Sequence, residues 1–180
     1  CGSKIVCAAR GKDYIFIVTD TSAYIMQFVG PPFTFSVRQV GSNCGAMSQH
    51  SLVHVDGIMY WMGKAGGFYV YDGVVKKIPC TVEDFVFSTQ TSDDLGFNFG
   101  QSEQVFAGYN TLFTEINWFY CKSGSTQIDR CVTLNYREGL WTTSSLARTA
   151  YSDKYVLDNP YATEYSVTGL PSVSINGITN

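Results

Sequence analysis

The sequence is short of charged residues: Asp, Glu, Lys and Arg make up only 15% of its 180 residues, against about a quarter in ordinary globular chains. Its formal net charge is −3, so it lacks the basic excess that marks a nucleic-acid-binding surface. No apolar run approaches the roughly 18 residues that suggest a membrane-spanning helix. With so little charge to cover its surface, we expect neighbouring subunits or further chain to cover part of it.

Motifs for metal, disulfide and glycosylation chemistry are also missing. None of the six cysteines belongs to a C-x-x-C pair, and their spacing fits no zinc site. Cys121 and Cys131 flank a long polar loop, where they could form a disulfide or stay reduced as small buried hydrophobic residues. No Asn-x-Ser/Thr sequon occurs, so nothing indicates a secretory route.

The sequence begins Cys1-Gly2-Ser3, without a methionine. One interpretation is a mature bacterial lipoprotein, whose first residue is an acylated cysteine. The other is a fragment of a longer chain. Residues 5–9 have the composition of a buried strand, where a lipoprotein would carry a polar tether, so we expect a fragment.

The sequence shows little helical periodicity. Instead it has short apolar or alternating runs, which are separated by Gly, Asn, Asp and Ser. Asp56-Gly57 and Asp72-Gly73 each join two such runs, and Asp-Gly accepts the positive φ angles of a tight hairpin. Pro31-Pro32 ends another run, because proline cannot donate to a sheet ladder. Residues 82–87 could be a helix or a strand, and residues 89–100 read as loop. The predicted strands are residues 5–9, 14–18, 23–28, 33–37, 51–55, 58–62, 68–71, 74–78, 116–120 and 131–136.

An aromatic hairpin pattern recurs along the chain. Its anchors are Phe16, Trp61 and Trp118, which lie 45 and 57 residues apart, close to the roughly 40–50 residues of a four-stranded propeller blade. We therefore expect an all-β, β-propeller-like fold, in which aromatic rings including that of Trp141 fill the wedges between short four-stranded blades. Residues 1–160 would hold about three blades, and residues 161–180 would begin a further β segment of an incomplete chain.

Two stretches resemble structural proteins of tailed bacteriophages: PPFTFSVRQVGSNCG with VDGIMYWMGKAGGFYVYDG within residues 31–73, and FYCKSGSTQIDRCVTLNYREGLWTTSSLARTA at residues 119–150. The nearest class is the tail nozzle or tail hub of short-tailed phages, which includes packaged-DNA stabilisation proteins. The resemblance implies a non-enzymatic virion protein that assembles in the host cytoplasm. Its copies would form a ring around the DNA exit channel, beside other tail, portal or adaptor proteins. No catalytic, cofactor or metal residues come with it, and passing duplex DNA would be contacted only weakly.

A glycan-binding or glycan-cleaving β-propeller of a tail or surface is the alternative. Residues 92–99 match the S-x-D-x-G-x-x-W turn of sialidase-type propellers, with Phe99 in place of Trp. That turn is structural, and cleavage would also need a pair of catalytic groups and an arginine cluster for a carboxylate. The five arginines are scattered along the sequence, at Arg10, Arg38, Arg130, Arg137 and Arg148.

Three further motifs have plain structural interpretations. His50 and His54 are four residues apart, but His54 lies in a strand pattern, where that spacing separates the two side chains too far for one metal ion. Residues 63–67 lack the Gly-Lys-Ser/Thr ending of a phosphate-binding loop. Residues 123–127 form either a solvated hairpin tip or a contact with a neighbouring subunit or receptor.

Overall fold

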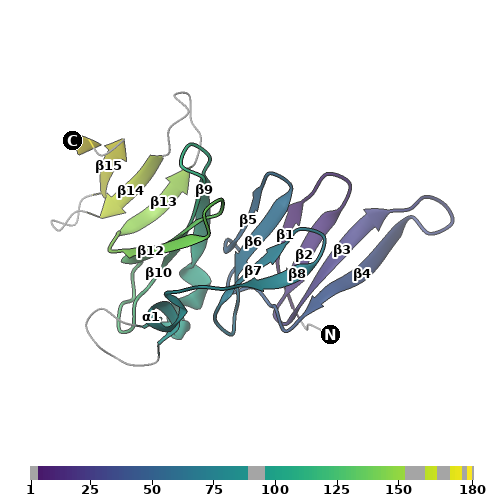
Figure 1. Ribbon diagram of the computed structural model, residues 1–180, viewed down its shortest axis with the longest axis horizontal. Coiled ribbons are helices and arrows are strands. Elements are labelled where there is room, and N and C mark those ends of the chain that lie inside the picture. Colours follow the sequence, from purple (N-terminus) through teal and green to yellow (C-terminus); the bar gives the residue numbers. More distant parts are fainter. Residues whose placement is uncertain (1–3, 89–95, 153–160, 166–170, 176–177, 180) are drawn as a thin grey trace. The chain divides into compact units, whose positions relative to one another are not determined.

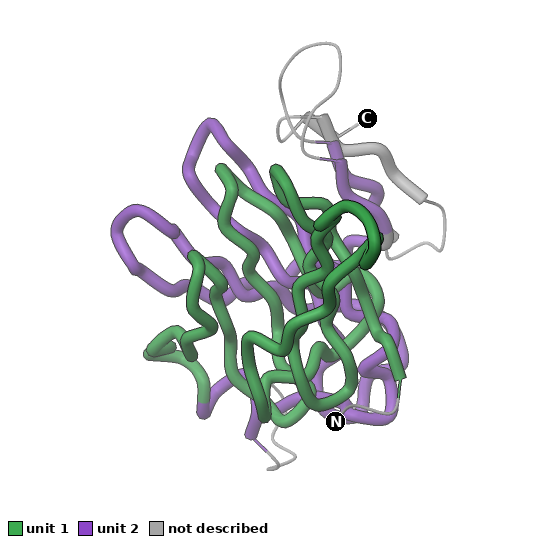
Figure 2. The backbone as a smooth tube through the Cα atoms, turned by 90° about the vertical axis from the view of Figure 1, so that its right-hand side faces the viewer, with its two compact units in different colours: residues 1–83 green, residues 84–180 purple. Residues whose placement is uncertain are grey.

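The computed structural model describes residues 4–88, 96–152, 161–165, 171–175 and 178–179. It is 53% strand and 8% helix, and its strands form four four-stranded antiparallel sheets. The predicted all-β class is therefore confirmed. The chain divides into two compact units, residues 1–83 and residues 84–180 (Figure 2).

Unit 1 contains two meandering sheets, in which every strand pairs with its neighbour in the chain (Figure 1). The N-terminal sheet consists of β1 (Ile5–Arg10), β2 (Ile15–Thr19), β3 (Ser22–Phe28) and β4 (Phe35–Ser42). The second sheet consists of β5 (Leu52–Val55), β6 (Ile58–Met62), β7 (Phe68–Tyr71) and β8 (Val75–Ile78).

The turns of unit 1 agree with the predicted hairpins except in one detail. Asp56 and Gly57 have φ angles of 50° and 84°, the two positive values that a tight hairpin turn requires. The β7–β8 turn is one residue longer than predicted, because β8 begins after Val74. There Gly73 has a φ of 113°, while Asp72 accepts a hydrogen bond at Oδ1 from the Val74 N–H at 3.4 Å.

Aromatic rings fill the space between the two sheets of unit 1. The Phe16 ring on β2 packs against the rings of Trp61 on β6 and Tyr71 on β7, with centroids 5.4 and 4.8 Å apart. Phe16 and Trp61 are fully buried. The Trp61 indole N–H donates to the Cys44 carbonyl at 2.7 Å, so this ring satisfies its one polar group inside the core.

Unit 2 also contains two sheets. The helix α1 (Glu83–Phe87) decides the open choice for residues 82–87 in favour of helix, and a 3₁₀ segment, η1, spans Phe99–Gln104. The third sheet has the order β12-β11-β10-β9, with β9 (Phe106–Asn110), β10 (Glu115–Tyr120), β11 (Arg130–Asn135) and β12 (Leu140–Ser144). The fourth sheet, whose strands lie on both sides of residue 160, consists of β13 (Arg148–Ser152), β14 (Tyr161–Tyr165), β15 (Pro171–Ile175) and β16 (Ile178–Thr179).

The sheets of unit 2 make the same kind of aromatic contact. The Trp118 and Trp141 rings stack within the third sheet, with centroids 6.1 Å apart. The Phe119 ring contacts the Tyr151 ring of the fourth sheet at 5.7 Å. Gly108 permits this approach, because a Cβ atom at that position would lie 2.2 Å from the Tyr151 ring. All three tryptophans are buried. The contact between sheets predicted for them is seen at Trp61, whereas Trp118 and Trp141 contact each other within one sheet.

The contact between the sheets of unit 1 predicts graded effects of substitution at Trp61. Trp61→Ala should lower the free energy of unfolding by about 3–5 kcal/mol, because it empties a packed core site. Trp61→Phe should cost less, since it keeps a ring but leaves the Cys44 carbonyl without its donor, a loss of about 1–3 kcal/mol. Chemical denaturation of the two variants measures both values. Equal stability of Trp61→Ala and the parent protein would contradict the packing role.

Candidate interaction surface

The N-terminal sheet is apolar on both faces, although only one of them is packed. Cys7, Phe16, Val18 and Ile25 point to the second sheet and are buried in the core. Residues directly paired across antiparallel strands share a face. The register pairs Ile15 with Met26, Met26 with Val37, and Phe28 with Phe35, so these five side chains occupy the other face.

This other face is exposed. We define the outer apolar face as the five sheet residues Ile15, Met26, Phe28, Phe35 and Val37, together with Phe33 of the β3–β4 turn. Phe28 is 68% exposed, Phe33 75% and Phe35 57%. Soluble monomers rarely expose a contiguous patch of large apolar side chains, and such a patch marks a binding surface.

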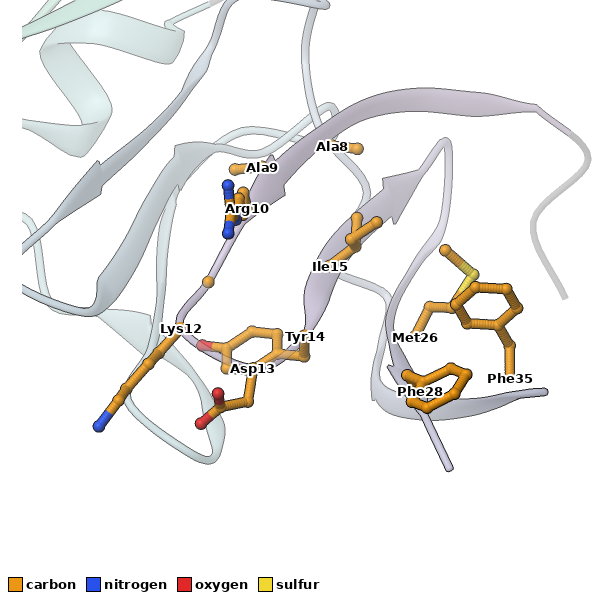
Figure 3. A pocket seen from close by; sticks show the side chains of 11 residues that line it. Ala8, Ala9, Arg10, Lys12, Asp13, Tyr14, Ile15, Met26, Phe28 and Phe35 are labelled. Atoms are coloured by element: carbon orange, nitrogen blue, oxygen red, sulfur yellow. The ribbon is translucent and has the colours of Figure 1, made fainter. Parts of the chain in front are cut away.

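A hollow of about 410 Å³ lies on this face (Figure 3). The Phe28 and Phe35 rings meet edge to face at 5.9 Å and form its apolar side with Met26. Arg10 and Asp13 line it as well. The hollow therefore combines apolar surface with charged groups of both signs, a composition that suits binding. Asp13 is its one carboxylate, so it does not hold the carboxylate pair that glycoside cleavage uses.

The outer apolar face ends at an unpaired edge. β4 is the last strand of the N-terminal sheet and, within the described part of the chain, pairs with β3 alone (Figure 1). The first five side chains of β4, from Phe35 to Gln39, are all exposed. Natural sheets usually protect an edge with charges, prolines or covering chain, whereas the one charged residue within β4 is Arg38. Among the described residues, both the edge strand and the adjoining face are thus exposed.

The histidines lie in or beside a strand, and the glycine-rich segment forms the turn between β6 and β7. His54 lies in β5 opposite Met59, and His50 is exposed before that strand. Within the described part of the chain, no group of three or more His, Cys, Asp or Glu side chains could hold a metal ion. In the β6–β7 turn the Gly63 N–H donates to the Gly67 carbonyl at 2.8 Å, so this amide is used internally and is not offered to a phosphate.

Two sequence motifs lie wholly or partly outside the described residues: Cys1-Gly2-Ser3, and the first part of the sialidase-like turn, Ser92-Asp93-Asp94-Leu95. The described end of that turn is structural. The Phe97 ring packs against Phe99 at 4.9 Å and stacks on Tyr120 of β10 at 5.5 Å. Arg10 and Arg38 lie on the two opposite edge strands of the N-terminal sheet.

Hydrogen bonds tie the backbone of the loop at residues 123–127 to its own chain, while Gly124, Thr126 and Gln127 are exposed to solvent. A contact of this loop with a neighbouring subunit or receptor stays a prediction. The Asn98 side-chain amide donates to the Ser125 carbonyl at 2.7 Å, and the Gln104 amide donates to the Thr126 carbonyl at 3.1 Å. Asn98 also caps η1, accepting from the Gly100 N–H at 3.0 Å. The loop thus reaches Asn98 and Gln104. The pattern Asn98-Phe99-Gly100 indicates the cap, but it does not indicate the bond to the Ser125 carbonyl.

All five described cysteines are free thiols: Cys7, Cys44, Cys80, Cys121 and Cys131. The predicted alternative of reduced, buried cysteines therefore holds for Cys121 and Cys131, and β11 places Cys131 opposite Phe119. Burial raises the pKa of the Cys7 thiol to about 12 and that of Cys131 to about 12. Thiols with raised pKa values are poor nucleophiles, so these two side chains act as core residues.

No family model matches the chain, and no protein of curated function has a significantly similar sequence. Among the described helices, neither is long and apolar enough to cross a membrane.

The buried thiols predict alkaline destabilisation. In the unfolded chain a thiol has a pKa of about 8.5. In the folded state Cys7 and Cys131 stay protonated well above that pH. Above that pH the folded state holds more protons, so the free energy of unfolding should fall by about 1.4 kcal/mol per pH unit for each thiol. Denaturant titrations between about pH 8 and pH 10.5 measure this slope. Cys7→Ala should make it shallower, and an unchanged slope in that variant would refute the assignment.

Asn98 both caps η1 and holds the loop, and substitutions at this residue should separate the contributions of these two roles to stability. Asn98→Ala should lower the free energy of unfolding by about 1–2 kcal/mol, because it removes both the helix cap and the tie to the loop. Asn98→Asp keeps the accepting oxygen of the cap and should lose only part of that stability. Thr126→Ala is the control, since Thr126 is exposed and takes part in the tie through its backbone carbonyl and not its side chain. An Asn98→Ala variant as stable as Thr126→Ala would contradict the tie.

Proposed function

We propose that this chain is a structural subunit of a phage tail, of the nozzle or hub class, whose copies form a ring around the DNA exit channel. It acts mechanically and not as an enzyme. It assembles in the host cytoplasm, takes its place in the virion, and contacts other tail, portal or adaptor proteins there.

The observation that carries this proposal is the outer apolar face. Its side chains are of the same kind as those of the inner face, which packs on the second sheet through Phe16. A large exposed apolar face marks a surface that a partner covers. Neighbouring subunits in a ring would supply the second cover, and they also account for a chain with few charges.

We further propose that the four sheets are blades of a β-propeller. Each has four antiparallel strands, which is the blade unit of that fold. In unit 1 the Phe16, Trp61 and Tyr71 rings occupy the wedge between two sheets that follow one another in sequence. Phe119 and Tyr151 make the equivalent contact in unit 2.

The charge of the chain supports a passive channel wall. Tight binding of duplex DNA needs several Lys or Arg side chains, each releasing counterions from the phosphates. The chain has 12 Lys and Arg residues and 15 Asp and Glu residues. A channel wall of this composition would bind DNA phosphates only weakly, which suits a conduit through which DNA slides.

The hollow beside Phe28 and Phe35 supports a second candidate function, a glycan-binding propeller of a tail or cell surface. Its size of about 410 Å³ falls within the roughly 300–1,000 Å³ of small-ligand pockets. Aromatic rings and the polar groups of Arg10 and Asp13 line it together. This function would involve binding without cleavage.

The ring proposal predicts a closed oligomer with weak DNA affinity. Native mass spectrometry should give one stoichiometry, and negative-stain electron microscopy should show rings with a central opening. Filter binding should give a dissociation constant for duplex DNA no tighter than the micromolar, non-specific range at physiological salt. A protein that stays monomeric at all concentrations, or binds DNA at nanomolar concentration with a steep salt dependence, would refute the proposal. Saturable binding on a glycan array by such a monomer would favour the second function.

A further inference from the structure

The two units carry opposite net charge. Residues 1–83 contain seven Lys and Arg against five Asp and Glu, a net charge of +2, whereas residues 84–180 contain five against ten, a net charge of −5. The net charge of −3 is therefore the sum of a weakly basic unit 1 and an acidic unit 2. Such a separation allows one copy to attract the opposite half of another.

The outer apolar face lies on the basic unit and has basic neighbours. Arg10 shares the face with Ile15, to which it is paired across β1 and β2. Lys12 lies in the β1–β2 turn, and both cations are exposed. Asp13 is the one acidic residue among those lining the hollow. The surface is therefore an apolar patch with a net positive border.

Unit 2 has its own cluster of exposed apolar side chains, and this one has acidic neighbours. Leu112 and Phe113 in the β9–β10 turn are 65% and 59% exposed, and Leu140 at the start of β12 is 59% exposed. Glu115 starts β10, and Glu138 lies in the β11–β12 turn. We call these five residues the acidic tip. Arg137 is the one cation in these two turns.

Hydrogen bonds hold the two turns of the acidic tip together at one end of the third sheet. Asn135 is paired with both Glu115 and Leu140. Its side chain donates to the Phe113 carbonyl at 3.4 Å and accepts from the Glu138 N–H at 3.1 Å. The Tyr136 N–H donates to the Thr114 carbonyl at 3.0 Å. The exposed side chains are thus presented by an ordered backbone, which lowers the entropy lost on binding.

We infer that the outer apolar face of one copy binds the acidic tip of a second copy. Each surface carries exposed apolar groups that need cover, and their borders have opposite charge. A contact between two identical outer faces would instead bring Arg10 and Lys12 of both copies together. A contact between different surfaces repeats from copy to copy and closes into a ring or continues as a filament. The inference rests on the proposed assembly of copies and names the surfaces that make it.

Two apolar-to-acidic substitutions test the contact. Phe35→Asp alters the face and Phe113→Asp alters the tip; both side chains are exposed, so circular dichroism should show each variant folded. Each should weaken self-association at least tenfold in sedimentation velocity, the loss typical of a central interface residue. Val74→Asp, at a residue that is 60% exposed but outside both surfaces, should leave association unchanged.

Mixing the two variants distinguishes this contact from one between identical surfaces. Phe35→Asp protein keeps an intact tip and Phe113→Asp protein keeps an intact face, so an equimolar mixture should form a one-to-one dimer and stop there. A contact between identical outer faces would give no such dimer.

Charge reversal tests the borders. Arg10→Glu with Lys12→Glu should weaken association, and adding Glu115→Lys with Glu138→Lys to the same chain should restore it, more completely at low salt.

The outcomes separate this inference from the proposed function. Rings that form normally in Phe35→Asp and Phe113→Asp protein would overturn the inference and leave the ring. Pairs that depend on both residues but never close would support the inference and overturn the ring. A parent protein that does not self-associate would overturn both.

Discussion

The contact of Phe16 with Trp61 and Tyr71 is the interaction on which unit 1 depends. The meanders of unit 1 have four to eight residues per strand, and each must bury its apolar face against another element. Packing β2 on β6 and β7 buries one face of both sheets at once. The same solution recurs in unit 2 through Phe119 and Tyr151, where Gly108 leaves room for the ring.

Local features of the fold could be predicted from the sequence, because they depend on a few adjacent residues. The β5–β6 turn follows from Asp56-Gly57, and the end of β3 follows from Pro31-Pro32. Exposure could not be predicted in this way. Residues 5–9 read as a buried strand, yet Ile5 is 66% exposed and Cys7 is the buried side chain. Alternation in β4 indicates two distinct faces, but nothing local shows that Val37 on the outer face has no cover.

Long-range attachments were the features that sequence reasoning missed. The bond between Asn98 and Ser125 joins residues 27 positions apart, and a loop rich in Ser, Gly and Thr looks the same in sequence whether it is solvated or attached. The β7–β8 turn was misjudged by one residue for a related reason. Asp72 can supply a positive φ or a side-chain acceptor, and only the surrounding strands decide which of the two is used.

The open edge of β4 has a consequence for how this protein must be made and stored. An uncovered strand whose neighbouring side chains are aromatic and β-branched is a template for stacking further strands, which is how cross-β deposits begin. Arg38 is the only gatekeeping charge within the strand. Chains in which the β4 edge stays exposed retain this template. Solubility should therefore depend on how promptly the edge is covered, even where the fold itself is stable.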